Sequence, residues 1–270
     1  MADYSKLATE ARRTVLGMIH KAQTSHIGSN LSVIDIATVL YENLKEGDEV
    51  VWSPSWKAAT IYYFLAKTGK IPESDLDLFY KEIDGKIPYL GLAETNVPGV
   101  WVNGGSVGHG LPVAVGMALA KERAGEEGTI YCILSDGELN EGSVWEAAML
   151  AAHHKLDNLV AIVDANGWQA MGRTEDVIDI NPMRAFLGFD WWTSEINGHD
   201  YKQIYEVFSN YLPGRPHAIV ARTIKGKGVS RFEDHLLYHY KNVTLEEYEE
   251  AIAELDDPLL YEKNLRKLRK

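Results

Sequence analysis

Two stretches of sequence decide the fold of this chain: Ser135-Asp136-Gly137-Glu138 and, one helix later, Val163-Asp164-Ala165-Asn166-Gly167-Trp168. Each lies at the end of a continuous apolar run of strand length, over 129–134 and 159–163. Apolar runs of this kind, separated by a helix over 144–154, are typical of a buried parallel βαβ unit. We therefore expect a parallel sheet, with a right-handed crossover between these two strands.

Asp136 and Asn166 each stand at the end of one of these strands, where ligands bind in open parallel sheets. Their carboxylate and amide oxygens are hard ligands that suit Mg²⁺ or Ca²⁺. Gly137 lets a backbone pass close to a phosphate, and the following helix directs its N-terminal amides to the same place. The alternative is that each residue only caps a helix or forms an Asx turn. Because two caps need not share one strand end, we favour a site for a metal-bound diphosphate.

The rest of the chain extends this pattern. Two more strands are expected over 191–196 and 218–222, and the alternation of strands with helices predicts a doubly wound α/β fold with helices on both faces of a mainly parallel sheet. We expect a single domain over 1–270, in which residues 245–270 form a charged helical C-terminal extension. Further helices are predicted from about residue 5 and over 33–44, 58–67, 73–80, 111–121 and 201–211.

Composition narrows the class of function. The chain has 270 residues, of which 46% are hydrophobic and 24% charged, with a net charge of −12. An acidic chain of this kind offers no electrostatic footprint for nucleic acid or an anionic membrane. The N-terminal residues do not resemble a signal peptide, and no apolar stretch reaches the length of a membrane span, so the cytoplasm is the expected location. Cys132 is the single cysteine and is expected to be a buried thiol.

At this point the chain resembles the transketolase family. Asp136-Gly137 followed thirty positions later by Asn166 matches the thiamine-diphosphate motif, in which an aspartate, an asparagine and a backbone carbonyl hold the metal. The likeness covers nearly the whole chain and is strongest to the N-terminal half of split transketolases. It is carried by the segments 135–159, Gly105-Ser106-Val107-Gly108-His109-Gly110-Leu111, 172–177 and 223–229.

The resemblance implies a cofactor and a partner. The cofactor is thiamine diphosphate with Mg²⁺ (or Ca²⁺), and the metal ligands carried over are Asp136, Asn166 and the Trp168 carbonyl. Backbone contacts to the cofactor carry over at Gly105 and Val107. The implied reaction transfers a two-carbon ketol unit from a sugar-type ketose donor to an aldehyde acceptor. In the family a second domain supplies the pyrimidine pocket, so a separate C-terminal pyrimidine-binding subunit is implied, in a heterotetramer of two such pairs.

Further site residues follow from the resemblance. His26 matches a loop histidine that contacts substrate, and Glu141 matches a glutamate in a proton-sharing network between active sites. These are the implied catalytic residues, although a glutamate in a first helical turn is also favoured by the helix dipole alone. His239 lies near the family's late histidine close to the diphosphate, but Tyr240 replaces the usual glycine. His235 is a rival for that role, and either histidine could be a solvated loop residue.

Two family histidines are replaced. Lys57 stands where a histidine lies near the cofactor phosphates, and its ammonium could serve the diphosphate as a point charge or simply be a surface group at a helix start. Leu90 replaces a histidine that faces the reacting two-carbon unit. These changes suggest retained thiamine chemistry on an altered donor. Two alternatives remain open: another thiamine-dependent acyloin-forming or 2-oxo acid enzyme, and a noncatalytic cofactor-binding protein, against which the retained Asp136, Asn166, Glu141 and His26 argue.

Overall fold

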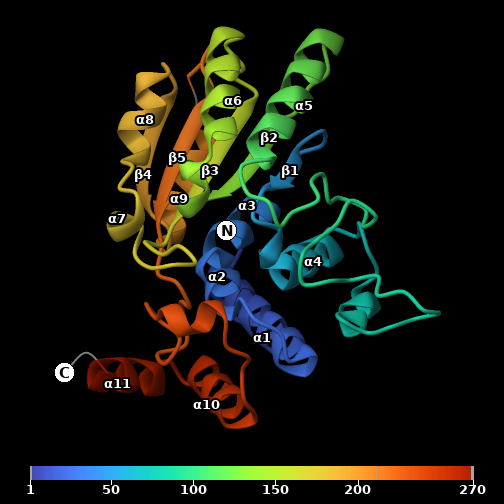
Figure 1. The fold of residues 1–270 in the computed structure, drawn as a ribbon, viewed down its shortest axis with the longest axis vertical. Helices are drawn as coiled ribbons and strands as arrows, with labels where there is room; N and C mark the ends of the chain where they lie inside the picture. The colour runs from blue at the N-terminus through green and yellow to red at the C-terminus, as the bar shows by residue number, and fades with distance from the viewer. Residues whose placement is uncertain (1, 211, 269–270) are drawn as a thin grey trace.

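A five-stranded parallel sheet forms the centre of the computed structural model, which describes residues 2–210 and 212–268 (Figure 1). The order of its strands is β1-β2-β3-β5-β4, and every neighbouring pair is parallel. This arrangement confirms the predicted doubly wound α/β fold. The strands are β1 (Glu49–Trp52), β2 (Ile130–Ser135), β3 (Leu159–Ala165), β4 (Trp192–Asn197) and β5 (His217–Arg222).

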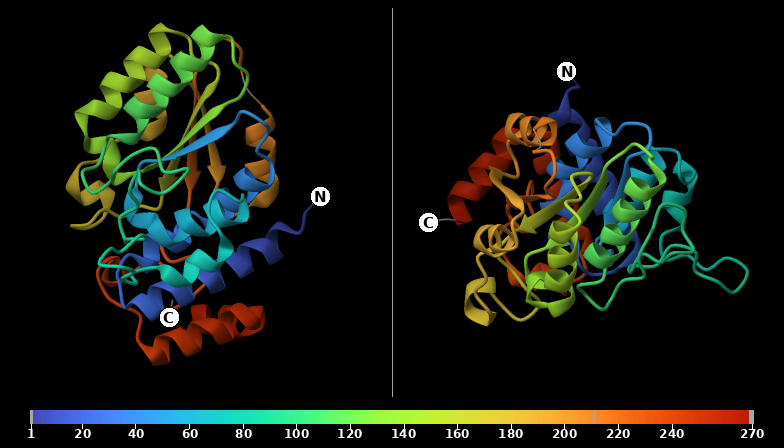
Figure 2. Two further views of the ribbon diagram at one scale, coloured as in Figure 1. Left: turned by 90° about the vertical axis from the view of Figure 1, so that its right-hand side faces the viewer. Right: turned by 90° about the horizontal axis from the view of Figure 1, so that it is seen from above.

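Apolar side chains alternate between the two faces of the sheet, because successive residues of a strand point to opposite sides. In β2, Cys132 and Leu134 belong to the core under α5 (Gly110–Ala124), α6 (Gly142–His153) and α8 (Pro182–Gly188), whereas Ile133 belongs to the core on the other face. Figure 2 shows α5 and α6 on one face and α9 (Tyr201–Ser209) on the other. Cys132 is a buried free thiol, as predicted.

The N-terminal helices cover the second face and differ in one place from the prediction. Helices α1 (Tyr4–Ala22), α3 (Ile34–Glu42) and α4 (Ala58–Lys67) agree closely with it. Helix α2 (Ile27–Ser32), however, begins directly after the loop histidine His26 and was not predicted. A Cβ atom at Gly28 would lie 3.0 Å from Cγ of Lys225, so α2 packs closely against that side chain.

Several elements were not predicted from the sequence. Strand β1 has only four residues, which are too few for a clear periodic pattern, yet it pairs along its whole length with β2. The segment 73–80 contains a 3₁₀ helix, η2 (Glu73–Leu78), rather than an α-helix. Short helical elements that follow β1, β2, β3 and β5 were not predicted either. They are η1 (Ser55–Lys57), η3 (Gly137–Asn140), α7 (Thr174–Val177), α8 and η4 (Leu236–His239).

The C-terminal extension consists of two helices, α10 (Leu245–Asp256) and α11 (Pro258–Leu268). Helix α10 begins with a capping box between Thr244 and Glu247, and it lies against α1 where Tyr248 stacks on His20 at 4.5 Å. Residues 269–270 of the predicted extension and residue 211 of the predicted helix over 201–211 lie outside the described residues. Among the helices that the structure describes, none is long and apolar enough to cross a membrane.

A buried polar network ties the N-terminal helices to the loop that follows β5. The guanidinium of Arg12 donates to both carboxylate oxygens of Asp35, at 3.0 and 2.6 Å, and its Nε donates to the Lys227 carbonyl at 3.0 Å. His199 shares its Nδ1 proton with Asp35 at 2.8 Å and accepts the Ile224 amide at Nε2, also at 2.8 Å. The network therefore holds the segment 224–227 against α1 and α3.

Replacing Asp35 with alanine should destabilise the fold, because the Arg12 charge would remain buried without its partner. We expect a loss of about 3–5 kcal/mol in the free energy of unfolding, measured by chemical denaturation. Glu195→Ala is the matched control, since it breaks the exposed ion pair between Arg222 and Glu195, at 2.7 Å, and should cost less than about 1 kcal/mol. Equal losses in the two variants would contradict this account.

Candidate functional site

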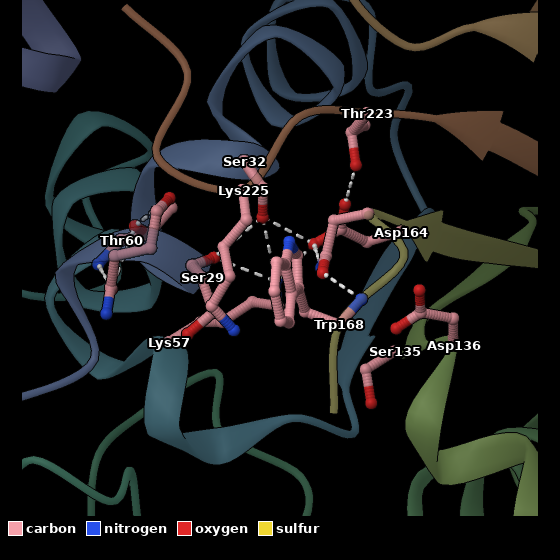
Figure 3. Close-up of polar contacts among 12 residues, drawn as sticks. Ser29, Ser32, Lys57, Thr60, Ser135, Asp136, Asp164, Trp168, Thr223 and Lys225 are labelled. Atoms are coloured by element: carbon pink, nitrogen blue, oxygen red, sulfur yellow. Dashed lines mark hydrogen bonds and ion pairs between the residues drawn. The ribbon is translucent and has the colours of Figure 1, made fainter. Parts of the chain in front are cut away.

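Polar side chains gather where four neighbouring strands end (Figure 3). Lys57 follows β1, Asp136 follows β2, Asp164 lies near the end of β3, and Lys225 follows β5. Because the strands are parallel, their carboxyl ends meet at one edge of the sheet. A cavity of about 620 Å³ lies at this edge.

The structure brings most of the predicted site residues to this one cavity. Asp136 lies beside it, next to the lining residue Gly137. The exposed His235 instead caps the start of η4, where its Nδ1 accepts from the Leu237 amide at 3.1 Å. The predicted residues in the lining are His26, Lys57, Gly105, Val107, Gly137, Glu141, Asn166, Trp168 and His239.

The Asp136 carboxylate is held by backbone amides. Its Oδ1 accepts from Gly137 at 2.9 Å, which makes it the N-cap of η3, and its Oδ2 accepts from Gly167 at 2.6 Å. Burial and the nearby negative charge of Asp164 raise the pKa of Asp136 to about 7. A divalent cation would offset both effects, because it stabilises the ionised form. Capping and metal binding are thus compatible at this residue.

Asn166 and Trp168 lie across from Asp136 on the loop after β3. The buried Asn166 accepts from the Trp168 amide at Oδ1, at 3.1 Å. The Trp168 indole donates to Asp234 at 2.8 Å, and Arg173 lies 4.0 Å from its ring while pairing with the same Asp234 carboxylate at 2.7 Å. These contacts fasten the loop that carries both predicted ligands to the segment around Asp234.

The donor set suits a hard cation whose coordination is completed by other molecules. One carboxylate, one amide oxygen and one backbone carbonyl are three oxygen ligands, and Mg²⁺ commonly takes few protein ligands together with phosphate oxygens and water. Within the described residues, no group of three or more histidine, cysteine, aspartate or glutamate side chains is placed to hold a metal. The chemistry of the set therefore fits a metal that arrives with a diphosphate.

Lys57 is fully buried and pairs with the equally buried Asp164. Its Nζ also donates to the Ser29 carbonyl at 2.8 Å. Burial alone would raise the pKa of Asp164, but the Lys57 ammonium and hydrogen bonds from Ser32 and Thr223 hold that pKa below its usual range. The alternative that Lys57 is a surface lysine is thus wrong. Its contact with phosphate stays a prediction.

Lys225 is a cavity residue that the sequence analysis did not single out. Its Nζ lies 3.0 Å from Nδ1 of His239, whose ring lies 5.0 Å from that of His26. Burial and the charge of Lys57 lower the pKa of Lys225 to about 8. Lys225 comes three residues after β5, so the strand-end reasoning that identified Asp136 and Asn166 also applied to it.

Both cavity histidines are neutral near pH 7. Burial and the Lys225 ammonium lower the pKa of His26 to about 4. The same two causes lower the pKa of His239 to about 3. A neutral imidazole can donate one hydrogen bond and accept another. His26 takes the left-handed backbone conformation, with φ of 72°, directly before α2, and its Nδ1 lies 2.8 Å from Oγ of Ser25.

The glycine-rich loop before α5 lies against the start of α6. Gly108 has φ of +84°, and a Cβ atom there would lie 2.7 Å from Cβ of Glu141, so the approach requires glycine. Glu141 is the exposed N-cap of α6. The buried Glu138, rather than Glu141, accepts from the Gly108 amide, at 2.9 Å. The role of Glu141 between active sites stays a prediction.

Leu90 does not line the cavity. Its carbonyl accepts from the Tyr62 hydroxyl at 2.9 Å. Leu92, two residues later, lines the cavity together with Trp56, Met171 and other apolar side chains. The lining that these side chains form is therefore largely apolar.

Comparison with known proteins identifies the family. Residues 4–255 match the family described as transketolase, thiamine diphosphate binding domain. The chain is 36% identical over 268 residues to one of the subunits of the apulose-4-phosphate transketolase of Actinobacillus succinogenes, covering 94% of this chain and 96% of that protein. It is 33% identical to SqwG, a subunit of the 6-deoxy-6-sulfo-D-fructose transketolase of Clostridium sp. (strain MSTE9), with the same coverage.

A solved structure gives the same result. The crystal structure of transketolase from Campylobacter jejuni superposes with a TM-score of 0.87 at 29% identity, over 95% of this chain. The chain spans 43% of the length of that transketolase, whereas it spans nearly the whole of the two split-enzyme relatives above. The chain therefore belongs to the transketolase family, as the thiamine-diphosphate-binding half of a split transketolase.

Proposed function

We propose that this chain is the diphosphate-binding half of a two-subunit transferase that moves a two-carbon ketol unit from a ketose donor to an aldehyde acceptor. One observation carries the proposal: Asp136, Asn166 and Trp168 come together at one cavity in a chain that matches its split-enzyme relatives over 96% of their length. When bound there, thiamine diphosphate supplies the nucleophilic carbon that breaks and forms carbon–carbon bonds.

Mg²⁺ is the ion that we propose for the site. Asp136 and Asn166 would bind it through their side-chain oxygens, and Trp168 through its carbonyl. Lys225 and His239 would face the diphosphate, the lysine as a charge and the neutral imidazole as a hydrogen-bond donor. The backbone at Gly105, Val107 and Gly137 would contact the cofactor. This assignment is supported by the cavity that these groups share.

His26 and Glu141 are the proposed catalytic residues. Near pH 7, a neutral His26 can orient a substrate oxygen by donating a hydrogen bond, or accept a proton from it. Its position on the same cavity as Lys225 and His239 supports that role. Glu141, exposed at the start of α6, would meet the second active site where two subunits touch.

A C-terminal pyrimidine-binding subunit is the proposed partner, in a heterotetramer of two pairs. Apolar side chains around the cavity support burial by another chain, because contiguous exposed apolar groups mark interaction surfaces. Leu92 is 40% exposed, Met171 77% and Ile178 55%. All three line the cavity.

The proposed donor is a ketose that differs from ordinary phosphorylated ketoses. Two relatives are named for apulose 4-phosphate and for 6-deoxy-6-sulfo-D-fructose. The apolar side chain of Leu92 and the replacement of a family histidine by Lys57, both in the cavity lining, support a changed donor pocket.

In the test, the chain is reconstituted with its pyrimidine-binding partner. Two-carbon transfer is then assayed with apulose 4-phosphate, with 6-deoxy-6-sulfo-D-fructose and with xylulose 5-phosphate. We expect transfer from a ketose with poor activity on xylulose 5-phosphate. Turnover of xylulose 5-phosphate at the rate of an ordinary transketolase would contradict the changed donor, and release of CO₂ from a 2-oxo acid would contradict the reaction class.

Replacing Asp136 with asparagine should weaken metal binding, because the site loses its charged ligand. We expect the Mg²⁺ concentration that half-saturates thiamine diphosphate binding to rise at least about 10-fold, measured by titration calorimetry on the reconstituted pair. Asp84→Asn, on an exposed loop, is the control and should bind as the wild type does. An unchanged Mg²⁺ requirement in the Asp136 variant would remove this residue from the site.

The affinity for a diphosphate should fall as the pH rises above about 8. Lys225 has its pKa lowered to about 8 in the folded chain, so its ammonium is present below that pH and is lost above it. We expect thiamine diphosphate binding to weaken as the pH is raised through about 8 to 9, and Lys225→Arg, which stays charged throughout, to flatten the profile. The same decline in both proteins would show that another group titrates.

A further inference from the structure

The Lys57 ammonium donates all of its hydrogen bonds to other groups of the protein (Figure 3). An ammonium carries three N–H donors. Its Nζ contacts Oδ2 of Asp164, the Ser29 carbonyl at 2.8 Å and Oγ of Ser32 at 3.4 Å. These contacts, all to described residues, take up the three donors. A direct bond from Lys57 to a phosphate would therefore have to replace one of them.

Asp164 is saturated in the same way. Its Oδ2 accepts from Lys57, from Ser32 Oγ at 2.6 Å and from Asn166 Nδ2 at 3.3 Å, and its Oδ1 accepts from the Thr223 hydroxyl. A carboxylate with these partners on both oxygens has little capacity left for a metal. Asp136, by contrast, is held by two backbone amides and has its pKa raised. Of the two aspartates at this strand edge, Asp136 is therefore better able to bind a cation than Asp164.

The contact between Asp164 and Asn166 sets the direction of the Asn166 amide. The Nδ2 group is turned to Asp164, so Oδ1 lies on the opposite side, where it accepts from the Trp168 amide at 3.1 Å. An amide whose nitrogen is held presents its oxygen in one direction only. The chain of contacts runs from Lys57 through Asp164 to the oxygen that is the predicted metal ligand.

We propose that Lys57 is a positioning residue for the metal site, which acts through Asp164 and Asn166 and not by binding the diphosphate. The inference rests on the proposed function for the identity of the cofactor. Without Lys57, Asp164 would be a buried and uncompensated charge. Asp164 would then compete with Asp136 for the cation. It would also no longer orient the Asn166 amide through a fixed hydrogen bond. Partners that orient metal ligands commonly change metal affinity by about 10–100-fold.

The experiment compares Lys57→Met, the double variant Lys57→Met with Asp164→Asn, and the wild-type chain. Lys70→Met is the control, because Lys70 is 46% exposed and its ion pair with Glu49 is 3.5 Å long. Thermal unfolding of the full chain is measured first. We expect Lys57→Met to lower Tm by roughly 10 °C and the double variant to recover most of that loss, because it removes both buried charges. A double variant as unstable as Lys57→Met would overturn the proposal.

Cofactor binding to the reconstituted pair is measured second, by calorimetry at several Mg²⁺ concentrations. We expect Lys57→Met to raise the Mg²⁺ requirement about 10–100-fold, to bind thiamine diphosphate almost normally at saturating Mg²⁺, and to regain most of its metal affinity in the double variant. A loss of thiamine diphosphate affinity that persists at saturating Mg²⁺ in both variants would mean direct phosphate contact and would overturn the proposal.

The two measurements separate this inference from the proposed function. If wild-type pairs do not bind thiamine diphosphate with Mg²⁺, the proposed function fails, and the unfolding comparison decides alone whether Lys57 acts through Asp164. If the wild type binds and only the variants behave otherwise than expected, the inference fails while the proposed function stands.

Discussion

The parallel pairing of β2 with β3 is the constraint on which the rest of the structure depends. Its register sets Ser135 opposite Asp164, so the residues that follow each strand emerge at the same level of the same edge. Asp136 can then accept a hydrogen bond from the Gly167 amide at 2.6 Å, across the two loops. Since β1 and β5 flank this pair in parallel, Lys57 and Lys225 arrive there as well.

Two kinds of charged group lie at this edge: a buried ion pair, and groups whose pKa values are perturbed. Lys57 and Asp164 neutralise one another with both side chains fully buried, and further hydrogen bonds saturate them. Asp136 and Lys225 instead keep perturbed pKa values, near 7 and 8, because burial and like charges act on them. Groups perturbed in this way are typical of binding sites, since a ligand of opposite charge stabilises their ionised forms.

Strands and helices with strong periodicity were predictable from the sequence, including β2, β3, α5 and the helices α1 and α4. Strand β1 was missed because four residues carry little pattern, and its identity comes from pairing with β2. Helix α2, directly after His26, was missed because its six residues are too few for a clear periodic pattern. The loops around the cavity contain recognisable motifs. Their contacts were not predictable, because the partner residues lie far away in the sequence.

The sequence by itself determined the class of fold, the family and the strand-end candidates for metal ligands, because alternation of apolar runs and the residues after them are local properties. Tertiary structure alone decided that Lys57 meets Asp164, 107 positions away, and that Lys225 meets His239 in the same cavity. It also decided that His239, and not His235, lines that cavity. Such pairings depend on the order of strands in the sheet and on which charged side chains are buried together. Neither can be predicted from the sequence of one segment.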